Sequence, residues 1–176
     1  AGMQEYLRQL KNFGIADEET MIAPGINGKM SELHAALGLS QLETVDEEIQ
    51  ARRRIAEYYN NRLAVVPGLI TPLFDSSTTK SNYAYYPLRV NSAAYGISRD
   101  VLHGCLAKFN IHARRYFYPL CSTSEWCRVA HGRLPNAEAA AQEMLCLPLY
   151  GSLPVETAAI ICDVITQLGA LAHETL

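Results

Sequence analysis

The sequence predicts an α+β fold in which a long helix leads into a small lobe, with a mainly antiparallel sheet and flanking helices. The first observation is a stretch over residues 31–64 whose apolar residues recur at helical spacing. The second is that short apolar runs alternate with helical patterns from residue 69 onward. The third is that Pro87 and Pro148 interrupt two of these runs, which is typical of edge or bulged strands.

The N-terminal residues have the pattern of a helix end. The stretch MQEYLRQLKNFG places Lys11 in a last helical turn and Gly14 where it can stop the helix, and residues 15–30 follow as a loop. A domain seldom begins with the tail of a helix that has nothing before it to pack on. We therefore expect residues 1–30 to be the remnant of a larger, preceding domain.

A long bridging helix is predicted over residues 31–66. Ser31 is its expected N-cap, and Pro67-Gly68 ends it. At about 1.5 Å per residue, such a helix is roughly 50 Å long, which exceeds the usual globular helix. The pattern therefore predicts either a bend at Gly38 or a helix that bridges two structural lobes.

Residues 67–176 are predicted to form a C-terminal small domain. Its strand candidates are 69–73, 83–90, 111–117 and 145–149. Helices are expected between and after them, at 99–109 with Ser98 as cap, at 135–144 with a proline in the first turn, and at 154–172. The polar loop 75–82 is the segment expected to be most mobile.

Composition excludes several classes of protein. A net charge of −3 and a pI of about 6.0 give no basic field for nucleic acid, and no apolar run approaches the ~20 residues of a membrane span. The five cysteines form no C-x-x-C pair, so we expect reduced thiols in a cytoplasmic protein. Cys121 and Cys127 with His131 match no zinc spacing, so no metal site is predicted.

Two stretches could carry chemistry, since no common hydrolase, zincin or nucleotide-loop motif occurs. In 23–42, Asn27 and Lys29 precede a helix start, which fits either helix punctuation or an anion site. In 112–120, HARRYFYPL, arginines and tyrosines crowd a predicted strand end. This second stretch fits either recognition of an anionic ligand or surface arginines over an aromatic face.

Alternation along a strand over 111–117 would sort these side chains by face. Arg114 and Tyr116 would share one face, with Arg115 and Phe117 on the other.

Taken in order, five segments of this chain resemble the C-terminal half of the DegT-type nucleotide-sugar aminotransferases, which are fold-type-I pyridoxal-phosphate enzymes. The segments are LKNFGI, APGINGKMSELHAALGLSQL, ARRRIAEYYNNRL, ARRYFYPL and LCLPLYGSLP. The most specific block runs from Gly25 to Leu39. Within the family, NFG and RRYFYPL are most similar to enzymes that aminate dTDP-4-keto-6-deoxyglucose.

The resemblance implies roles for particular residues in a homodimer with shared active sites. Asn27 would reach across the interface to the phosphate of the neighbour's pyridoxal phosphate, with Lys29 beside it. Arg115, Tyr116 and Tyr118 would form part of the pocket for a nucleotide-linked keto sugar, and glutamate would be the amino donor. Residues 1–30 would then be the remnant of the large cofactor-binding domain.

The resemblance also implies that a catalytic residue lies elsewhere. The family's Schiff-base lysine precedes LKNFG, whereas this chain has only Lys11, Lys29, Lys80 and Lys108, none in that context. Pyridoxal chemistry needs that lysine, so we expect no catalytic residue here and no activity from this chain alone. The alternatives are a non-catalytic interaction module, or part of a related sugar dehydratase in which a histidine replaces the lysine.

Overall fold

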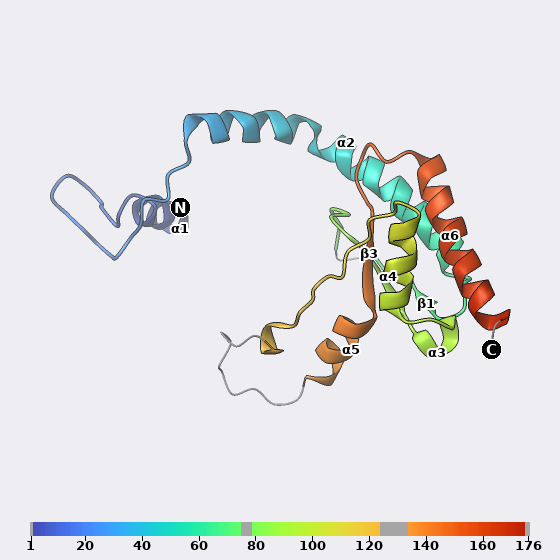
Figure 1. The fold of residues 1–176 in the computed structure, drawn as a ribbon. Helices are drawn as coiled ribbons and strands as arrows, with labels where there is room; N and C mark the ends of the chain where they lie inside the picture. The colour runs from blue at the N-terminus through green and yellow to red at the C-terminus, as the bar shows by residue number, and fades with distance from the viewer. Residues whose placement is uncertain (1, 75–78, 124–133, 175–176) are drawn as a thin grey trace. The chain divides into compact units, whose positions relative to one another are not determined.

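The computed structural model describes residues 2–74, 79–123 and 134–174 (Figure 1). The chain divides into two compact units, Ala1–Asp46 and Glu47–Leu176, here called the N-terminal and the C-terminal unit. The boundary falls within helix α2 (Glu32–Leu63), so this helix belongs to both units. Two sequence predictions lie wholly or partly outside the described residues. They are the prediction that the loop 75–82 is mobile and the prediction that Cys121, Cys127 and His131 form no metal site.

The N-terminal unit begins with helix α1 (Gly2–Leu10), as the sequence predicts. The chain that follows α1 pairs with the chain that precedes α2 through isolated bridges between Asn12 and Asn27 and between Ile15 and Met21. Gly14 has a φ of +78°, and a Cβ there would lie 1.7 Å from the carbonyl oxygen of Ala23. Only glycine permits this close approach, so the turn depends on it.

Helix α2 is continuous for 32 residues, which confirms the long helix. Its helical assignment runs through Gly38 without a break, and the bend predicted at that residue stays a prediction. Its buried residues are all in the second half and recur at helical spacing, at Ile55, Ala56, Tyr59 and Leu63. Gly68, with a φ of +79°, follows in the turn that leads to the sheet.

The C-terminal unit contains a three-stranded antiparallel sheet in the order β1 (Leu69–Ile70), β2 (Tyr86–Val90), β3 (Met144–Leu147). Leu69 faces Val90 across the first pair, and Tyr86 faces Leu147 across the second. The antiparallel sheet confirms the predicted class. Each strand is shorter than its apolar run, and β1 ends before Pro72, which has no N–H to donate.

The predicted strand over 111–117 is wrong. Arg114 alone of that segment pairs with the sheet, through a bridge to Cys146 in which each backbone N–H donates to the other residue's carbonyl, at 2.9 and 2.7 Å. Ile111 N instead donates to the carbonyl of Leu106, which continues the turn after the preceding helix. The segment therefore crosses the edge of β3 and leaves it.

The helices of this unit follow the predicted order. They are α3 (Ser92–Tyr95), α4 (Arg99–Lys108), the 3₁₀ turn η1 (Cys121–Thr123), α5 (Pro135–Glu143) and α6 (Val155–Glu174). Ser98 caps α4 by accepting a hydrogen bond from the backbone of Val101, as expected. Helix α3 is not among the predicted helices, although Asn91 caps it and Gly96 ends it.

One core joins the second half of α2, the sheet, α4 and α6, and α4 and α6 lie side by side (Figure 1). The Tyr59 and Tyr86 rings meet in it with centroids 4.8 Å apart, and the Tyr59 hydroxyl donates to the carbonyl of Pro148. Among the described helices, α6 alone is long and apolar enough to cross a membrane. Its buried residues follow a helical stripe in this core, and Val155, Ile160 and Leu171 of the same helix are exposed.

Candidate functional site

The segment that carries Asn27 and Lys29 is held against the end of α1. Ile26 N donates to the Leu10 carbonyl at 2.9 Å, and Gly28 N donates to the Lys11 carbonyl at 2.8 Å. A Cβ at Gly25 would lie 2.2 Å from the backbone nitrogen of Gly14. The two backbone segments can therefore pack this closely only because residue 25 is a glycine. The backbone around Asn27 is therefore fixed by pairing on both sides.

The side chains of Asn27 and Lys29 differ in what they contact. Lys29 Nζ donates to Asn12 Oδ1 at 3.1 Å and lies 4.7 Å from the centre of the Phe13 ring. Asn27 is exposed, and within the described ranges its amide makes no hydrogen bond. The Lys11 side chain starts beside Gly28. An exposed amide with a free donor, followed two residues later in the chain by a lysine, is a donor set that suits a phosphate group.

The start of α2 behaves as the sequence predicts. The Ser31 hydroxyl accepts from the backbone of His34 at 3.4 Å and lies 2.6 Å from His34 Nδ1. Ser31 therefore caps the helix. Its hydroxyl is engaged by the helix itself, so Asn27 rather than Ser31 offers a free donor.

In the C-terminal unit, the two neighbouring arginines take different partners. Arg114 Nη1 donates to the Tyr116 hydroxyl at 2.7 Å, so these two side chains share a side as expected. Arg115 Nη1 lies 3.4 Å from Asp100 Oδ1, and its guanidinium is 5.2 Å from the centre of the Tyr118 ring. Because the segment is not a strand, Phe117 does not oppose Tyr116: their rings stack with centroids 5.1 Å apart.

Arg99 anchors the side of the segment on which Arg115 lies. Its side chain is 1% exposed and donates to Asp100 Oδ1 at 2.9 Å. The guanidinium also donates to the carbonyls of Met144 and Ala141, at 2.7 and 3.0 Å, which satisfies the end of α5. Asp100 is thus shared by a buried and an exposed arginine.

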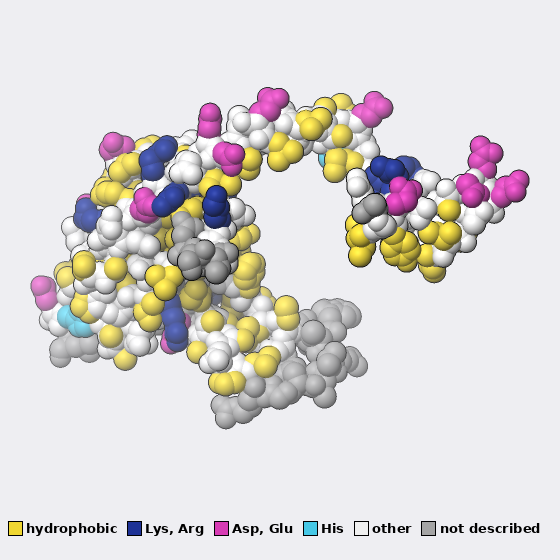
Figure 2. Space-filling model, turned by 180° about the vertical axis from the view of Figure 1, so that it is seen from behind, with side chains coloured by type: hydrophobic (Ala, Val, Ile, Leu, Met, Phe, Trp, Pro, Cys, Tyr) yellow, Lys and Arg dark blue, Asp and Glu magenta, His cyan; other side chains and the backbone are white. Residues whose placement is uncertain are grey.

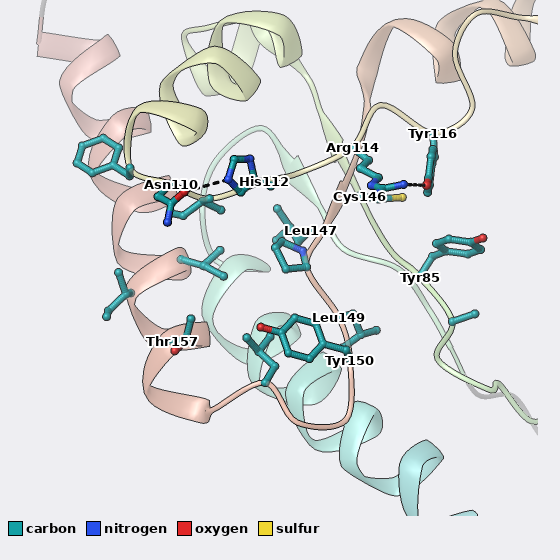
Figure 3. A pocket seen from close by; sticks show the side chains of 17 residues that line it. Tyr85, Asn110, His112, Arg114, Tyr116, Cys146, Leu147, Leu149, Tyr150 and Thr157 are labelled. Carbon is teal, nitrogen blue, oxygen red and sulfur yellow. Dashed lines mark hydrogen bonds between the residues drawn. The ribbon is translucent and has the colours of Figure 1, made fainter. Parts of the chain in front are cut away.

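A pocket of about 720 Å³ opens between β3, the start of α6 and the segment 109–116 (Figure 3). Its floor is apolar, and its polar groups converge from several elements. The described residues that line it are Ala84, Tyr85, Phe109, Asn110, Ile111, His112, Arg114, Tyr116, Cys146, Leu147, Pro148, Leu149, Tyr150, Leu153, Thr157, Ile160 and Ile161. None of these is a carboxylate or a lysine.

The chemistry of this pocket is that of a binding site. Burial raises the pKa of the Cys146 thiol to about 11, so the thiol stays protonated at neutral pH and is a poor nucleophile. His112 Nε2 is 2.9 Å from Asn110 Oδ1, and Tyr85 packs edge-on against Tyr116. An apolar floor with a few converging polar groups is typical of small-molecule sites.

Within the C-terminal unit, the predicted site residues take two positions. Tyr116 lines the pocket, whereas Arg115 and Tyr118 pack together beside it, on Asp100 and Arg99. Asn27 and Lys29 belong to the N-terminal unit. The other polar residues that line the pocket are not among the site residues predicted from the sequence: Tyr85, Asn110, His112, Arg114, Tyr150 and Thr157.

For Arg114, a usable signal was present. Its spacing of two from Tyr116 placed both on one side, and that pair now forms one wall of the pocket. Tyr150 and Thr157 carried no such signal, because only the folded chain brings them opposite Arg114.

The chain belongs to the DegT/DnrJ/EryC1/StrS aminotransferase family, whose pattern matches residues 2–166. It is 45% identical over 152 residues to a dTDP-4-amino-4,6-dideoxy-D-glucose transaminase of Escherichia coli, covering 84% of this chain and 40% of the relative. It is 36% identical over 173 residues to the transaminase of the same name from Shigella dysenteriae, covering 94% of this chain and 45% of the relative. The chain therefore spans less than half the length of either relative.

A solved structure agrees with the family assignment. The crystal structure of DesI in the presence of its TDP-sugar product superposes with a TM-score of 0.82 at 30% identity, covering 96% of this chain and 43% of that one. Aminotransferases of this family use pyridoxal phosphate. The exposed Asn27 amide beside Lys29 is a donor set that fits the phosphate of that cofactor.

Proposed function

We propose that this chain supplies the C-terminal part of a pyridoxal-phosphate-dependent aminotransferase that acts on a nucleotide-linked keto sugar. The observation that carries the proposal is the free Asn27 amide, held in a paired turn beside Lys29 and just ahead of α2. It lies in the block by which the chain resembles the family. The names of the relatives make a dTDP-linked 4-keto-6-deoxy sugar the first substrate to test.

The chain's own residues would hold the cofactor by its phosphate. Asn27 would donate its side-chain amide, and Lys29 would add a positive charge that Asn12 and Phe13 keep in place. When bound, pyridoxal phosphate supplies the electron sink that amino transfer needs. In our proposal the phosphate belongs to the neighbouring subunit of a cytoplasmic homodimer, as in the family that the sequence resembles.

The substrate would be held by the C-terminal unit. Tyr116 faces the pocket, and Arg115 and Tyr118 extend the same segment beside it. An arginine and tyrosine hydroxyls suit the hydroxyl and phosphate oxygens of a nucleotide sugar. The apolar wall formed by β3 and the start of α6 would shield the bound nucleotide sugar from water.

The lysine that carries the cofactor would come from outside this chain. The chain's four lysines are Lys11, Lys29, Lys80 and Lys108. None lies in a segment like that of the family's catalytic lysine, and Lys29 is engaged by Asn12 and Phe13. We therefore propose that the 176-residue chain alone has no transaminase activity, while the protein made from the complete gene has it.

The test uses protein expressed from the complete gene, with pyridoxal phosphate, ¹⁵N-glutamate and dTDP-4-keto-6-deoxyglucose. We expect a ¹⁵N-labelled amino sugar by mass spectrometry, and none from the 176-residue chain under the same conditions. A deoxygenated sugar without nitrogen would support the dehydratase alternative instead. No conversion of any nucleotide-linked keto sugar would contradict the proposal and favour a non-catalytic module.

A further inference from the structure

We infer that the pocket beside β3 binds the nucleoside diphosphate part of the substrate, with Arg114 as its anion contact. The inference rests on the proposed function for the identity of the ligand, and on the chemistry of the pocket for its location. Figure 3 shows Arg114 and Tyr116 directed toward each other on one side, with Tyr150 and Leu149 across from them.

The charge of the pocket is the first argument. Arg114 is the one arginine among its described lining residues, and no aspartate, glutamate or lysine lines it. Within the described ranges Arg114 has no carboxylate partner. A guanidinium has five N–H donors, and Tyr116 takes one of them, so a fork of donors remains for a phosphate. The pocket therefore complements an anion although the whole chain carries a charge of −3.

The neighbouring arginine sharpens this argument. Arg115 contacts the Asp100 carboxylate, which also accepts a hydrogen bond from the buried Arg99. Part of the charge on Arg115 is thus already balanced, and its side chain is not among those lining the pocket. Of the two arginines, Arg114 is the one with an unbalanced charge inside a cavity.

The apolar part of the pocket is the second argument. Leu147, Pro148, Leu149 and Leu153 form a floor beside the charged side, with Tyr85 and Tyr150 rings at its edges. Aromatic and aliphatic walls accept the face of a nucleobase. The volume of about 720 Å³ lies within the ~300–1,000 Å³ range of small-molecule sites.

Polar groups for the edge of a base stand on the same walls. Asn110 and His112 come from the turn after α4, and Thr157 comes from the first turns of α6. Amide, imidazole and hydroxyl groups can meet the carbonyl and N–H groups of a pyrimidine ring. A cation on one side, an apolar floor and polar edge groups together match a nucleoside diphosphate better than an inorganic anion or a purely apolar molecule.

The first test measures the dissociation constant of thymidine diphosphate by calorimetry, with protein expressed from the complete gene. Arg114→Gln should weaken binding about tenfold to a hundredfold, the range expected for a lost charge-assisted contact. Arg115→Gln should weaken it several-fold less than Arg114→Gln. Arg89→Gln, which breaks an exposed pair with Glu143 outside the pocket, should leave the constant unchanged. An Arg115→Gln effect equal to or larger than that of Arg114→Gln would overturn the inference.

A second pair of variants tests the apolar floor without disturbing the core. Ile160 is 59% exposed and lines the pocket, and Val155 is 45% exposed on the same helix and does not line it. Ile160→Trp should fill the pocket and weaken thymidine diphosphate at least tenfold, whereas Val155→Trp should leave its affinity unchanged. Equal affinities for both variants would exclude this pocket as the nucleotide site.

The parts of the ligand separate the two halves of the pocket. Arg114→Gln should weaken the binding of inorganic pyrophosphate and leave the affinity for thymidine unchanged. Ile160→Trp should weaken the binding of thymidine. The reverse pattern would contradict the assignment. All these constants are measured without cofactor or keto sugar. Failure of amino transfer would therefore count against the proposed function, while normal nucleotide binding by Arg114→Gln would count against this inference alone.

Discussion

The two units of this chain differ in whether their apolar side chains are buried. The C-terminal unit buries its leucines and tyrosines in one core, with Leu63, Leu88, Leu102 and Leu106 all at 0% exposure. In the N-terminal unit, the leucines of α2 stay exposed, and Leu33 reaches 84%. Figure 2 shows hydrophobic side chains gathered on the surface of both units.

The same helix shows both behaviours. The second half of α2 buries a stripe of one side, whereas its first half has apolar residues on several sides at Leu33, Leu37, Leu39 and Leu42. A helix that is apolar on many sides is typical of one surrounded by other protein. This difference supports the proposal of a homodimer with shared active sites, in which each subunit also has a larger cofactor-binding domain. The partner subunit and that domain would together cover the first half of α2.

The largest expected effect is a contrast between two leucines of α2. Leu63→Ala should lower the free energy of unfolding by about 2–5 kcal/mol, because it opens a cavity in the core of the C-terminal unit. Leu37→Ala should change it by less than about 0.5 kcal/mol, because the side chain is 61% exposed. Urea unfolding of the 176-residue chain, followed by circular dichroism, measures both. Equal losses would show that the first half of α2 is packed as firmly as the second.

A similar contrast separates two arginines. Arg99→Met leaves the carbonyls of Ala141 and Met144 without their donor, so it should cost about 2–4 kcal/mol of unfolding free energy. Arg8→Met removes an exposed pair with Glu5 and should cost no more than about 1 kcal/mol. The comparison uses the same urea titration. A near-zero loss for Arg99→Met would show that water satisfies both carbonyls in the variant.

The helices of this chain show which parts of the fold can be predicted from the sequence alone. Periodicity and caps predicted α2, α4 and α6, because the residues that decide a helix are neighbours along the chain. The short helix α3 also carries local signals in the sequence, an Asn91 cap and Gly96 at its C-terminal end.

The strand predicted over 111–117 failed for a different reason. A run of β-branched or aromatic residues shows only that a segment suits a sheet. Whether the segment pairs depends on residues that are far away in the sequence. Here only Arg114 meets Cys146. The partner of Arg115 could not be predicted either, because Asp100 lies 15 residues earlier, on helix α4. Sequence could therefore nominate the 112–120 segment but could not tell which of its arginines faces a cavity.

Alkaline pH should weaken the C-terminal unit, which holds every cysteine of the chain. Burial raises the pKa of Cys146 to about 11 and that of Cys162 to about 12, from an ordinary value of 9.0, and it also raises the pKa of Tyr95. Unfolded thiols ionise first, so their stabilising effect is complete below pH 9 and is lost as pH rises toward 11–12.

We therefore expect the free energy of unfolding to fall by about 1–3 kcal/mol between pH 9 and pH 11 in reducing buffer. Urea titrations at pH 8, 9, 10 and 11 measure it. The Cys162→Ala variant should show a shallower fall over the same range. A slope unchanged by this substitution would show that Cys162 does not cause the pH dependence, and would leave Cys146 and the buried tyrosines as its sources.

The smallest effect on the fold is expected at Asn27, which is exposed and buries little. Asn27→Ala should change the free energy of unfolding by less than about 0.5 kcal/mol. In protein from the complete gene it should weaken retention of pyridoxal phosphate about tenfold to a hundredfold, because an amide donor to a charged group is worth roughly 1.5–3 kcal/mol. Cofactor absorbance after dialysis measures the loss. Asn12→Ala, which frees Lys29, should weaken retention less.

Mixed dimers decide whether Asn27 serves its own subunit or the neighbour's. One partner carries Asn27→Ala, and the other lacks the lysine that binds the cofactor. If Asn27 acts across the interface, both lesions fall into one of the two sites, and the other site is intact. Such dimers should regain activity that neither homodimer has. If mixed dimers form and show no activity above that of the homodimers, then Asn27 contacts the cofactor of its own subunit. The exposed first half of α2 would then need another explanation than a shared active site.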